Sequence, residues 1–299
     1  MKREEMKRQM KLKVADIIIE ARATQENVGL WLAGPHEKFL VEEGSHDTLL
    51  RIVYGDIPQV DMGKRLFATD GVWNLYARDR KYYIPFVSPT TGPTPYRLVV
   101  LDEDFQEGHL FVRPRTDLAE EFGAGHVAIC PFEYPLDELI MVNLLARGRG
   151  LNIHACGVGW HSRGLAFCGA SGAGKSTLAR LFAERGVPVL SDDRLILRRQ
   201  DGALWIHGTP WHGDASASLA EKASLEKLYF LRHAPANEIV PLSPGEAVKR
   251  LLTCCFPPFY YAPGMEYTLS FMAQLTQEIP CYELGFVPDD SAVELVLKL

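Results

Sequence analysis

The nine residues GASGAGKST are the stretch of this sequence with the most evident chemistry. Their spacing, G-x-x-x-x-G-K-[ST], is that of a phosphate-binding loop. Glycines let the backbone turn tightly, so that successive N–H groups point into one anion-sized hollow. The lysine can reach the outer phosphates of a nucleotide, and the following hydroxyl can join the coordination shell of Mg²⁺. The pattern therefore predicts a site for ATP and Mg²⁺. The residues of this loop are Gly169, Ala170, Ser171, Gly172, Ala173, Gly174, Lys175, Ser176 and Thr177.

Two adjacent carboxylates, Asp192 and Asp193, follow Lys175 by seventeen and eighteen residues. They end the apolar segment VPVLS, which is typical of a buried strand. Ligands of open α/β sheets bind at the carboxyl ends of strands, so both side chains are predicted to face the phosphates. One carboxylate can help to hold Mg²⁺, and the other can take the proton from an acceptor hydroxyl. A helix cap or a solvated turn is the structural alternative.

Two further side chains are candidates for the same site. His154 lies in the apolar strand LNIHACGVG, twenty-one residues before Lys175. A lone histidine in a strand is more often a hydrogen-bonded core residue than a catalytic one. Arg250, in EAVKRLL, is a candidate to offset charge on the transferred phosphate, as arginines often do in phosphoryl transfer. An exposed helix cation is the alternative for Arg250.

Two other segments allow more than one interpretation. In HGTPWHGD, the side chains of His207, His212 and Asp214 could suggest a metal cluster, but no further ligands follow at metal-site spacing. A loop that faces the substrate and a plain structural turn both stay open for this segment. The aromatic, proline-rich stretch FPPFYYAPG (256–264) is predicted to be a loop, which either shapes a pocket for a peptide or a base or simply packs.

The elements around these residues predict an α/β fold for 121–299. Helices are expected over 135–148, 176–185, 243–252 and 288–299, and strands over 151–160, 164–169 and 187–193. Ser243 and Glu246 stand at capping-box spacing, which predicts a helix start there. Residues 1–120 are expected to form a smaller β-rich domain of short strands, in which we find no catalytic constellation and which could present the acceptor to the catalytic domain. In this half, 72–87 is a predicted hairpin and 88–95 a predicted loop.

Composition narrows the class of protein further. The 299 residues are 47% hydrophobic and 23% charged, which is typical of a globular protein, and no apolar run is long enough to span a membrane. The net charge of −6 disfavours electrostatic binding of nucleic acid over a large surface. Residues 1–13 are a charged run expected to be a solvated or frayed helix, not a secretory signal. Six cysteines without a CxxC pair predict reduced thiols and a cytoplasmic protein.

The stretch from Leu151 to Asp193 resembles the core of the HPr kinase/phosphorylase family, which has the phosphoenolpyruvate carboxykinase-like nucleotide-binding fold. The family shows a histidine in a strand, a short hairpin, the glycine-rich loop, a helix and an Asp-Asp pair, and the resemblance extends over 135–299. It implies that Asp193 is the base that activates a serine hydroxyl of a peptide or protein and that Asp192 lies near Mg²⁺. It also implies that His154 sits near the transferring phosphate.

The chain resembles the broader relatives of the family more than the true HPr kinases. True HPr kinases have a second signature, an acidic residue before a basic-Gly-apolar-Gly stretch. It is absent after the Asp pair of this sequence, where IHGTPWHGDAS stands instead. That segment is similar to one found in kinases encoded beside lasso peptides. HPr is therefore in doubt as the substrate, and so is the reverse phosphorylase reaction. True HPr enzymes assemble as hexamers, and a homo-oligomer stays open for this chain.

These observations together predict an ATP-dependent, Mg²⁺-assisted kinase that phosphorylates a hydroxyl, with a serine of a peptide or protein as the favoured acceptor. A small-molecule kinase is the alternative within that class. A nucleotide-dependent switch or hydrolase, and a binding module that holds the nucleotide structurally, are alternatives from other classes. The sequence has no N-K-x-D motif for guanine, which disfavours a GTPase.

Overall fold

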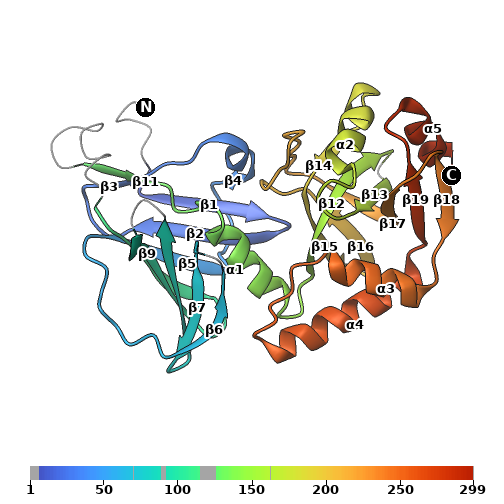
Figure 1. Ribbon diagram of the computed structural model, residues 1–299. Coiled ribbons are helices and arrows are strands. Elements are labelled where there is room, and N and C mark those ends of the chain that lie inside the picture. The colour runs from blue at the N-terminus through green and yellow to red at the C-terminus, as the bar shows by residue number, and fades with distance from the viewer. Residues whose placement is uncertain (1–6, 70, 89–91, 115–125, 162, 299) are drawn as a thin grey trace. The chain divides into compact units, whose positions relative to one another are not determined.

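The computed structural model describes residues 7–69, 71–88, 92–114, 126–161 and 163–298 (Figure 1). The chain forms two compact units, residues 1–141 and 142–299. The expected boundary near residue 120 lies earlier than this division. Strand β11 (Val127–Ile129) pairs in parallel with β3 (Val28–Leu30), which ties the residues after 126 to the first unit.

The first unit is built around a nine-stranded mixed sheet of order β4-β1-β2-β5-β10-β9-β8-β7-β6. One face is buried, as β10 shows: Leu110 and Val112 are buried, whereas Glu107 and His109 are exposed. The bounds are β1 (Gln9–Val14), β2 (Ile17–Ala23), β4 (Leu40–Val41), β5 (Thr48–Tyr54), β6 (Lys64–Ala68), β7 (Asn74–Arg78), β8 (Lys81–Ser88), β9 (Gly92–Asp102) and β10 (Glu107–Val112), with a 3₁₀ helix, η2, at Gly34–Phe39.

Three expectations about this unit have clear outcomes. The hairpin over 72–87 is confirmed, because β7 and β8 pair in antiparallel fashion. The loop over 88–95 is wrong in part: β9 already begins at Gly92, and residues 89–91 lie outside the described part of the chain. The helix over 1–13 is wrong for residues 9–13, which belong to β1; Met10 and Leu12 alternate with polar residues and bury one face. Residues 1–6 lie outside the described part.

The second unit contains an eight-stranded sheet of order β13-β12-β15-β16-β17-β19-β18, with β14 also paired to β12. An additional pairing of β13 with β17 closes five of these strands into a ring. The bounds are β12 (Leu151–Trp160), β13 (Arg163–Cys168), β14 (Val189–Ser191), β15 (Arg194–Gln200), β16 (Ala203–His207), β17 (Lys222–His233), β18 (Glu238–Pro241) and β19 (Cys281–Phe286). Strands β13, β17 and β19 run parallel, so their carboxyl ends share one edge of the sheet.

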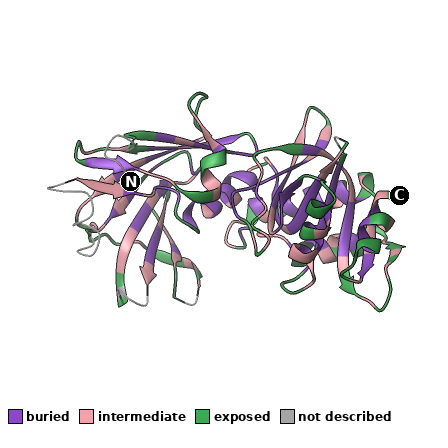
Figure 2. Ribbon diagram, turned by 90° about the horizontal axis from the view of Figure 1, so that it is seen from above, coloured by how far each residue is buried: buried purple, intermediate pink, exposed green. Residues whose placement is uncertain are grey.

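Helices cover both faces of this sheet, which makes the unit a mixed α/β structure (Figure 1). One buried cluster joins α3 and α4 to the strands, and a second, separate cluster joins α2 and α5 to them. Figure 2 shows the buried residues concentrated in the strands between these layers. The bounds are α1 (Leu136–Leu145), which runs across the division between the units, α2 (Lys175–Glu184), α3 (Pro244–Thr253), α4 (Ala262–Glu278) and α5 (Asp290–Lys298).

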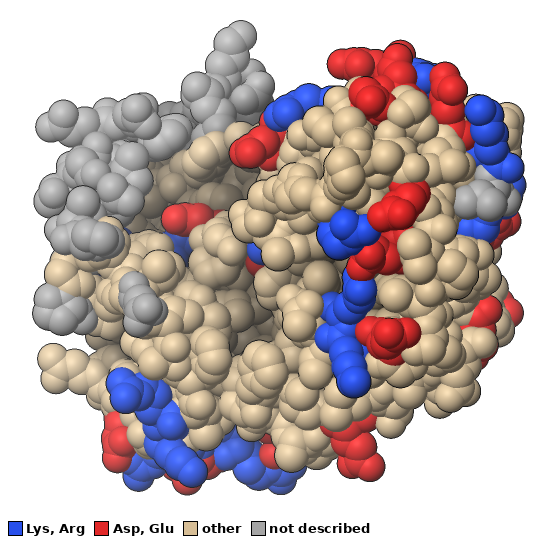
Figure 3. Space-filling model, turned by 45° about the vertical axis from the view of Figure 1, so that its right-hand side comes forward, with Lys and Arg blue, Asp and Glu red and all other residues tan. Residues whose placement is uncertain are grey.

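Helix α3 begins as predicted, with the complete capping box of Ser243 and Glu246. Helix α4 was not expected, and it begins inside the predicted loop 256–264. Its buried stripe includes Gly264, Thr268 and Thr276, which are poor markers of an apolar helical face. No helix of the described residues is both long and apolar enough to cross a membrane. On the face drawn in Figure 3, acidic and basic side chains lie interleaved.

Candidate active site

The glycine-rich loop connects β13 to α2, at the carboxyl edge of the parallel strands. Two of its glycines adopt positive φ angles, 81° at Gly172 and 100° at Gly174, which side chains of L-residues rarely allow. A Cβ atom at Gly174 would lie 2.7 Å from Cε1 of Phe286. Gly174 also occupies the cap position before α2, so the loop N–H groups gather at the positive end of that helix.

Lys175, the first residue of α2, is curled back over the loop and is only 6% exposed. Its Nζ donates to the carbonyl oxygens of Gly169, at 2.9 Å, and Ala170, at 3.0 Å. Burial lowers the pKa of this ammonium group, while the nearby Asp193 carboxylate acts in the opposite direction. The lysine charge is thus held against the carbonyl oxygens at the start of the loop.

Strand register brings His154 and the aspartate pair to this loop. Strand β12 lies between β13 and β15: its Ala155 pairs with Cys168, the residue before the loop, and its His154 pairs with Arg194. The backbone N–H of Ala155 also donates to the carbonyl of Asp193, at 3.1 Å. Because neighbouring strands lie about 5 Å apart, these residues form one row across the sheet edge.

Asp193 is the accessible carboxylate of the pair, with 27% of its side chain exposed. One oxygen, Oδ1, lies 2.8 Å from Nε2 of His154, and the other forms an ion pair with Arg194. Burial raises the pKa of Asp193, but the hydrogen bond from His154 and the charge of Arg194 outweigh it, and the net pKa is lowered. Asp193 is therefore an ionised carboxylate held between two basic side chains.

Asp192 has a different environment, because it is fully buried. Its Oδ1 accepts from the backbone N–H of Gly213, at 2.9 Å, and Ala217, at 3.2 Å, and its Oδ2 accepts from Ala215, at 2.9 Å. A carboxylate that accepts three backbone hydrogen bonds fixes the loop that donates them. The two adjacent aspartates thus have separate roles in the structure: Asp192 anchors the 213–217 loop, and Asp193 faces the phosphate loop.

The predicted magnesium ligands can be tested against this geometry. A Cβ atom at Gly213 would lie 2.8 Å from Oδ2 of Asp192 and 3.4 Å from Oγ of Ser176. Both oxygens are therefore close to the same position beside Gly213. Oδ2 accepts one backbone N–H, and a carboxylate oxygen has two acceptor positions. Mg²⁺ in nucleotide sites takes only one or two protein oxygens beside the phosphates. Ser176 and Asp192 fit that requirement, although the described residues contain no cluster of three His, Cys, Asp or Glu side chains.

Comparisons with known proteins add little to this geometry. No protein-family model matches the chain, and no curated protein matches it either. A solved structure described as the Hpr(Ser) kinase/phosphatase from Coxiella burnetii matches with 11% sequence identity and a TM-score of 0.30, covering 49% of this chain and 93% of that one. A TM-score of 0.30 is too low to establish a shared fold.

Arg250 lies at the end of α3, with its Nη1 2.6 Å from Oε2 of Glu283 on β19. Arg232 of β17 also pairs with Glu283, at 2.7 Å, and with Glu238 of β18. Hydrogen bonds from Arg232 and Arg250 lower the pKa of Glu283 and outweigh burial, which raises it. The described partner of Arg250 is thus on β19. Strand β17 lies between β19 and β13, the strand that leads into the phosphate loop.

The segment HGTPWHGD leaves β16 and returns beside the aspartate pair. His207 is buried at the end of β16, whereas Nδ1 of His212 lies 2.9 Å from the carbonyl oxygen of the next residue, Gly213. The carbonyl of Asp214 accepts from Arg180 of α2, at 3.0 Å. His212 and Asp214 thus make separate contacts, that of Asp214 through its backbone, and the segment places its backbone against Asp192 and α2.

Sequence reasoning missed His233, the last residue of β17. Its Nε2 lies 2.9 Å from the carbonyl oxygen of Gly172, and a carbonyl can only accept, so Nε2 carries the proton. His233 pairs across the sheet with Phe286, the residue that packs against Gly174. The ends of two parallel strands therefore support the phosphate loop from one side. The only hint in the sequence is the apolar run KLYFLRH, which ends in this histidine.

We expect His233→Ala to weaken binding of MgATP by roughly 2- to 10-fold, because one hydrogen bond contributes about 0.5–1.5 kcal/mol. Titration calorimetry would measure the dissociation constant. His233→Gln, whose side-chain N–H can donate in place of Nε2, should restore most of the affinity. Equal affinity in the wild type and the alanine variant would show that this hydrogen bond does not position the loop.

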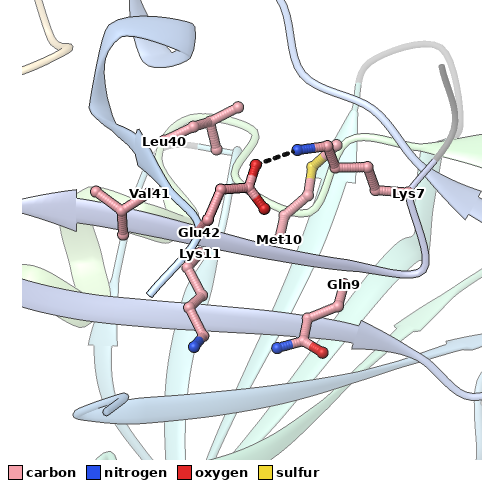
Figure 4. A pocket seen from close by; sticks show the side chains of 7 residues that line it. All are labelled: Lys7, Gln9, Met10, Lys11, Leu40, Val41 and Glu42. Atoms are coloured by element: carbon pink, nitrogen blue, oxygen red, sulfur yellow. Dashed lines mark hydrogen bonds and ion pairs between the residues drawn. The ribbon is translucent and has the colours of Figure 1, made fainter. Parts of the chain in front are cut away.

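One surface cavity of the first unit carries no comparable chemistry (Figure 4). It lies beside β1 and β4 and has a volume of about 220 Å³, below the range of roughly 300–1,000 Å³ usual for ligand pockets. Lys7 and Glu42 form an exposed ion pair at its rim, with 2.6 Å between Nζ and Oε1. The hydrogen bond from Lys7 lowers the pKa of Glu42.

Proposed function

We propose that the chain transfers the γ-phosphoryl group of ATP to a hydroxyl group, with a serine of a peptide or protein as the acceptor. The observation that carries this proposal is the strand register that joins His154, the end of β13 and the Asp193–Arg194 pair in one row. A phosphate loop alone would serve a binding protein equally well. A phosphate loop beside an ionised, partly exposed carboxylate offers a base for an acceptor.

Each side chain has a distinct task in this proposal. Lys175 and the loop N–H groups bind and orient the phosphates, and Ser176 with Asp192 would hold Mg²⁺. When bound, Mg²⁺ would neutralise charge on the phosphate oxygens. Asp193 accepts the proton of the acceptor hydroxyl. His154, 2.8 Å from Asp193 Oδ1, holds that carboxylate in place beside the transferring phosphate.

The same residues would also permit transfer to water or to a small-molecule hydroxyl. The described contacts do not select a serine: that preference rests on the resemblance seen in the sequence. A binding module that uses the nucleotide structurally has no need of an ionised carboxylate next to the phosphate loop, so the position of Asp193 disfavours it.

Transfer of label from [γ-³²P]ATP to a peptide library or cell extract tests the proposal, with mass spectrometry to locate the modified side chain. We expect a stable phosphoester on a serine. Lys175→Met should lower the affinity for MgATP and the transfer rate, because the cation that meets the phosphates is lost. Release of labelled phosphate that no peptide or extract alters, with no labelled product, would identify a hydrolase or switch. Tight binding of ATP without turnover would identify a binding module.

A further inference from the structure

The cation nearest to the proposed base is Arg194, the first residue of β15. Its Nη1 forms an ion pair with Oδ2 of Asp193. Its guanidinium carbon lies 4.3 Å from the centre of the Phe256 ring, which is a stacking distance. The side chain is 15% exposed. Arg194 is therefore held in one position by charge on one side and by an aromatic face on the other.

This position is inside the candidate site. Arg194 and His154 are cross-strand partners, and they contact the two different oxygens of Asp193. The charges of Arg194 and Asp193 both act on Lys175 of the phosphate loop. The guanidinium thus shares one electrostatic environment with the proposed base and with the lysine of the phosphate loop.

Arg250, the arginine that the sequence suggested for the phosphate, has a different setting. Its described ion pair joins it to Glu283, which already accepts from Arg232. Its side chain is 40% exposed, and the strand that carries Glu283 is separated from β13 by β17. Arg250 lies on α3 and its partner Glu283 lies on β19, in a partly exposed network of ion pairs. It is therefore less suited than Arg194 to contact a phosphate bound at the loop.

Charge balance leads to the same residue. With Lys175 protonated and both carboxylates ionised, Asp192 and Asp193 leave this part of the site with one net negative charge before Arg194 is counted. Arg194 cancels that charge directly beside the proposed base. Its largest effect is therefore expected on the phosphoryl group during transfer, whose charge is spread over its oxygens in the transition state.

We propose that Arg194, rather than Arg250, is the catalytic cation that contacts the phosphoryl group during its transfer, while its ion pair with Asp193 orients the base. This inference rests on the proposed phosphotransfer. The acceptor oxygen attacks the γ-phosphorus, and the bond from that phosphorus to the β,γ-bridging oxygen breaks. The bond electrons leave with ADP, and the hydroxyl proton passes to Asp193. The planar fork of Arg194 donates to the phosphoryl oxygens, whose charge is spread in the transition state.

The test compares a transition-state analogue with the ground state. Aluminium fluoride with MgADP mimics the phosphoryl group in flight, so a residue that contacts this group should affect trapping of MgADP and leave plain MgATP binding nearly unchanged. We expect Arg194→Met to bind MgATP within about 3-fold of the wild type and to reduce aluminium-fluoride trapping by about 100-fold or more. Arg194→Lys keeps the positive charge but lacks the planar guanidinium group, so it should trap MgADP at an intermediate level. This variant provides the test if Arg194→Met does not fold.

Arg199→Met is the matched control, because Arg199 lies on the same strand and pairs with Glu278 on the surface, at 2.7 Å. It should trap as the wild type does. The inference is overturned if Arg194→Met traps MgADP as well as the wild type does. It is also overturned if Arg250→Met is the only variant that loses trapping. A wild-type protein that binds MgATP but traps no MgADP overturns it as well, since no cation would then face the transferred group. A wild-type protein that binds no nucleotide instead refutes the proposed function itself.

Discussion

Asp193→Asn should reduce phosphoryl transfer by about 10²- to 10⁴-fold, the usual contribution of a positioned general base. The substitution keeps the size of the side chain and removes its negative charge. An amide cannot take a hydroxyl proton, so the acceptor would have to ionise without help. Initial rates of label transfer from [γ-³²P]ATP, or of its hydrolysis where no acceptor is present, measure this effect.

Nucleotide affinity should change little in the same variant. In the proposed function the phosphates would meet Lys175 and the N–H groups of the loop, whereas Asp193 contacts His154 and Arg194. Removing a negative charge near a polyanion could even tighten binding slightly. We therefore expect a fall in kcat with the KM for ATP within about 3-fold of the wild type, because an interaction made only in the transition state is lost.

Asp201→Asn is the matched control for this experiment. Asp201 is exposed in the turn between β15 and β16, so the same chemical change there should leave transfer unaltered. If Asp193→Asn transfers at the wild-type rate, Asp193 is not the base, and the phosphate loop would retain only its binding role. If both nucleotide affinity and rate collapse together, Asp193 is needed for the shape of the site.

The parts of the site that could be predicted are those set by local sequence. The phosphate loop needs only closely spaced glycines and a helix start, and the capping box of α3 needs only Ser243 and Glu246. The Asp pair could be placed at a strand end because it follows a short apolar run. Each of these features depends on residues within about ten positions of one another.

The rest depends on contacts between distant segments. The separation of the two aspartate roles follows from N–H groups of the 213–217 loop, more than twenty positions after Asp192. The support from His233 depends on parallel pairing of β13, β17 and β19, which no short pattern reveals. Sequence also offered no reason to prefer Arg194 to Arg250, because both are single arginines near apolar segments. Helix α4 was hidden because Gly264 and Thr268 face the core.

Asp192→Ala should destabilise the folded protein by about 3–5 kcal/mol, because three partly buried backbone N–H groups lose their charged, fully buried acceptor. The adjacent carboxylate, Asp193, does not replace it, because Asp193 is engaged by His154 and Arg194. Urea unfolding followed by tryptophan fluorescence measures the change. Trp211, buried just before the anchored loop, provides a reporter close to the substitution.

Asp192→Asn should lie between the wild type and the alanine variant. The asparagine carbonyl oxygen can accept from Gly213 and Ala217, as Oδ1 does, but its amide group would then point an N–H toward the N–H of Ala215. Activity should fall with stability in both variants. The loop that Asp192 anchors borders Ser176 through Gly213, and its release would open that side of the site.

The adjacent residue supplies the decisive comparison. Asp193→Asn should change the free energy of unfolding by less than about 1 kcal/mol, because its partners are partly solvated and can rehydrate. Asp192→Ala should therefore lower both stability and activity, whereas Asp193→Asn should lower turnover and leave stability nearly unchanged. If Asp192→Ala instead folds like the wild type and only requires more Mg²⁺ for activity, Asp192 is a metal ligand alone and the loop is held by other contacts. A buried hydrogen-bond acceptor such as Asp192 should affect the free energy of unfolding, and a partly exposed base such as Asp193 should affect the turnover rate.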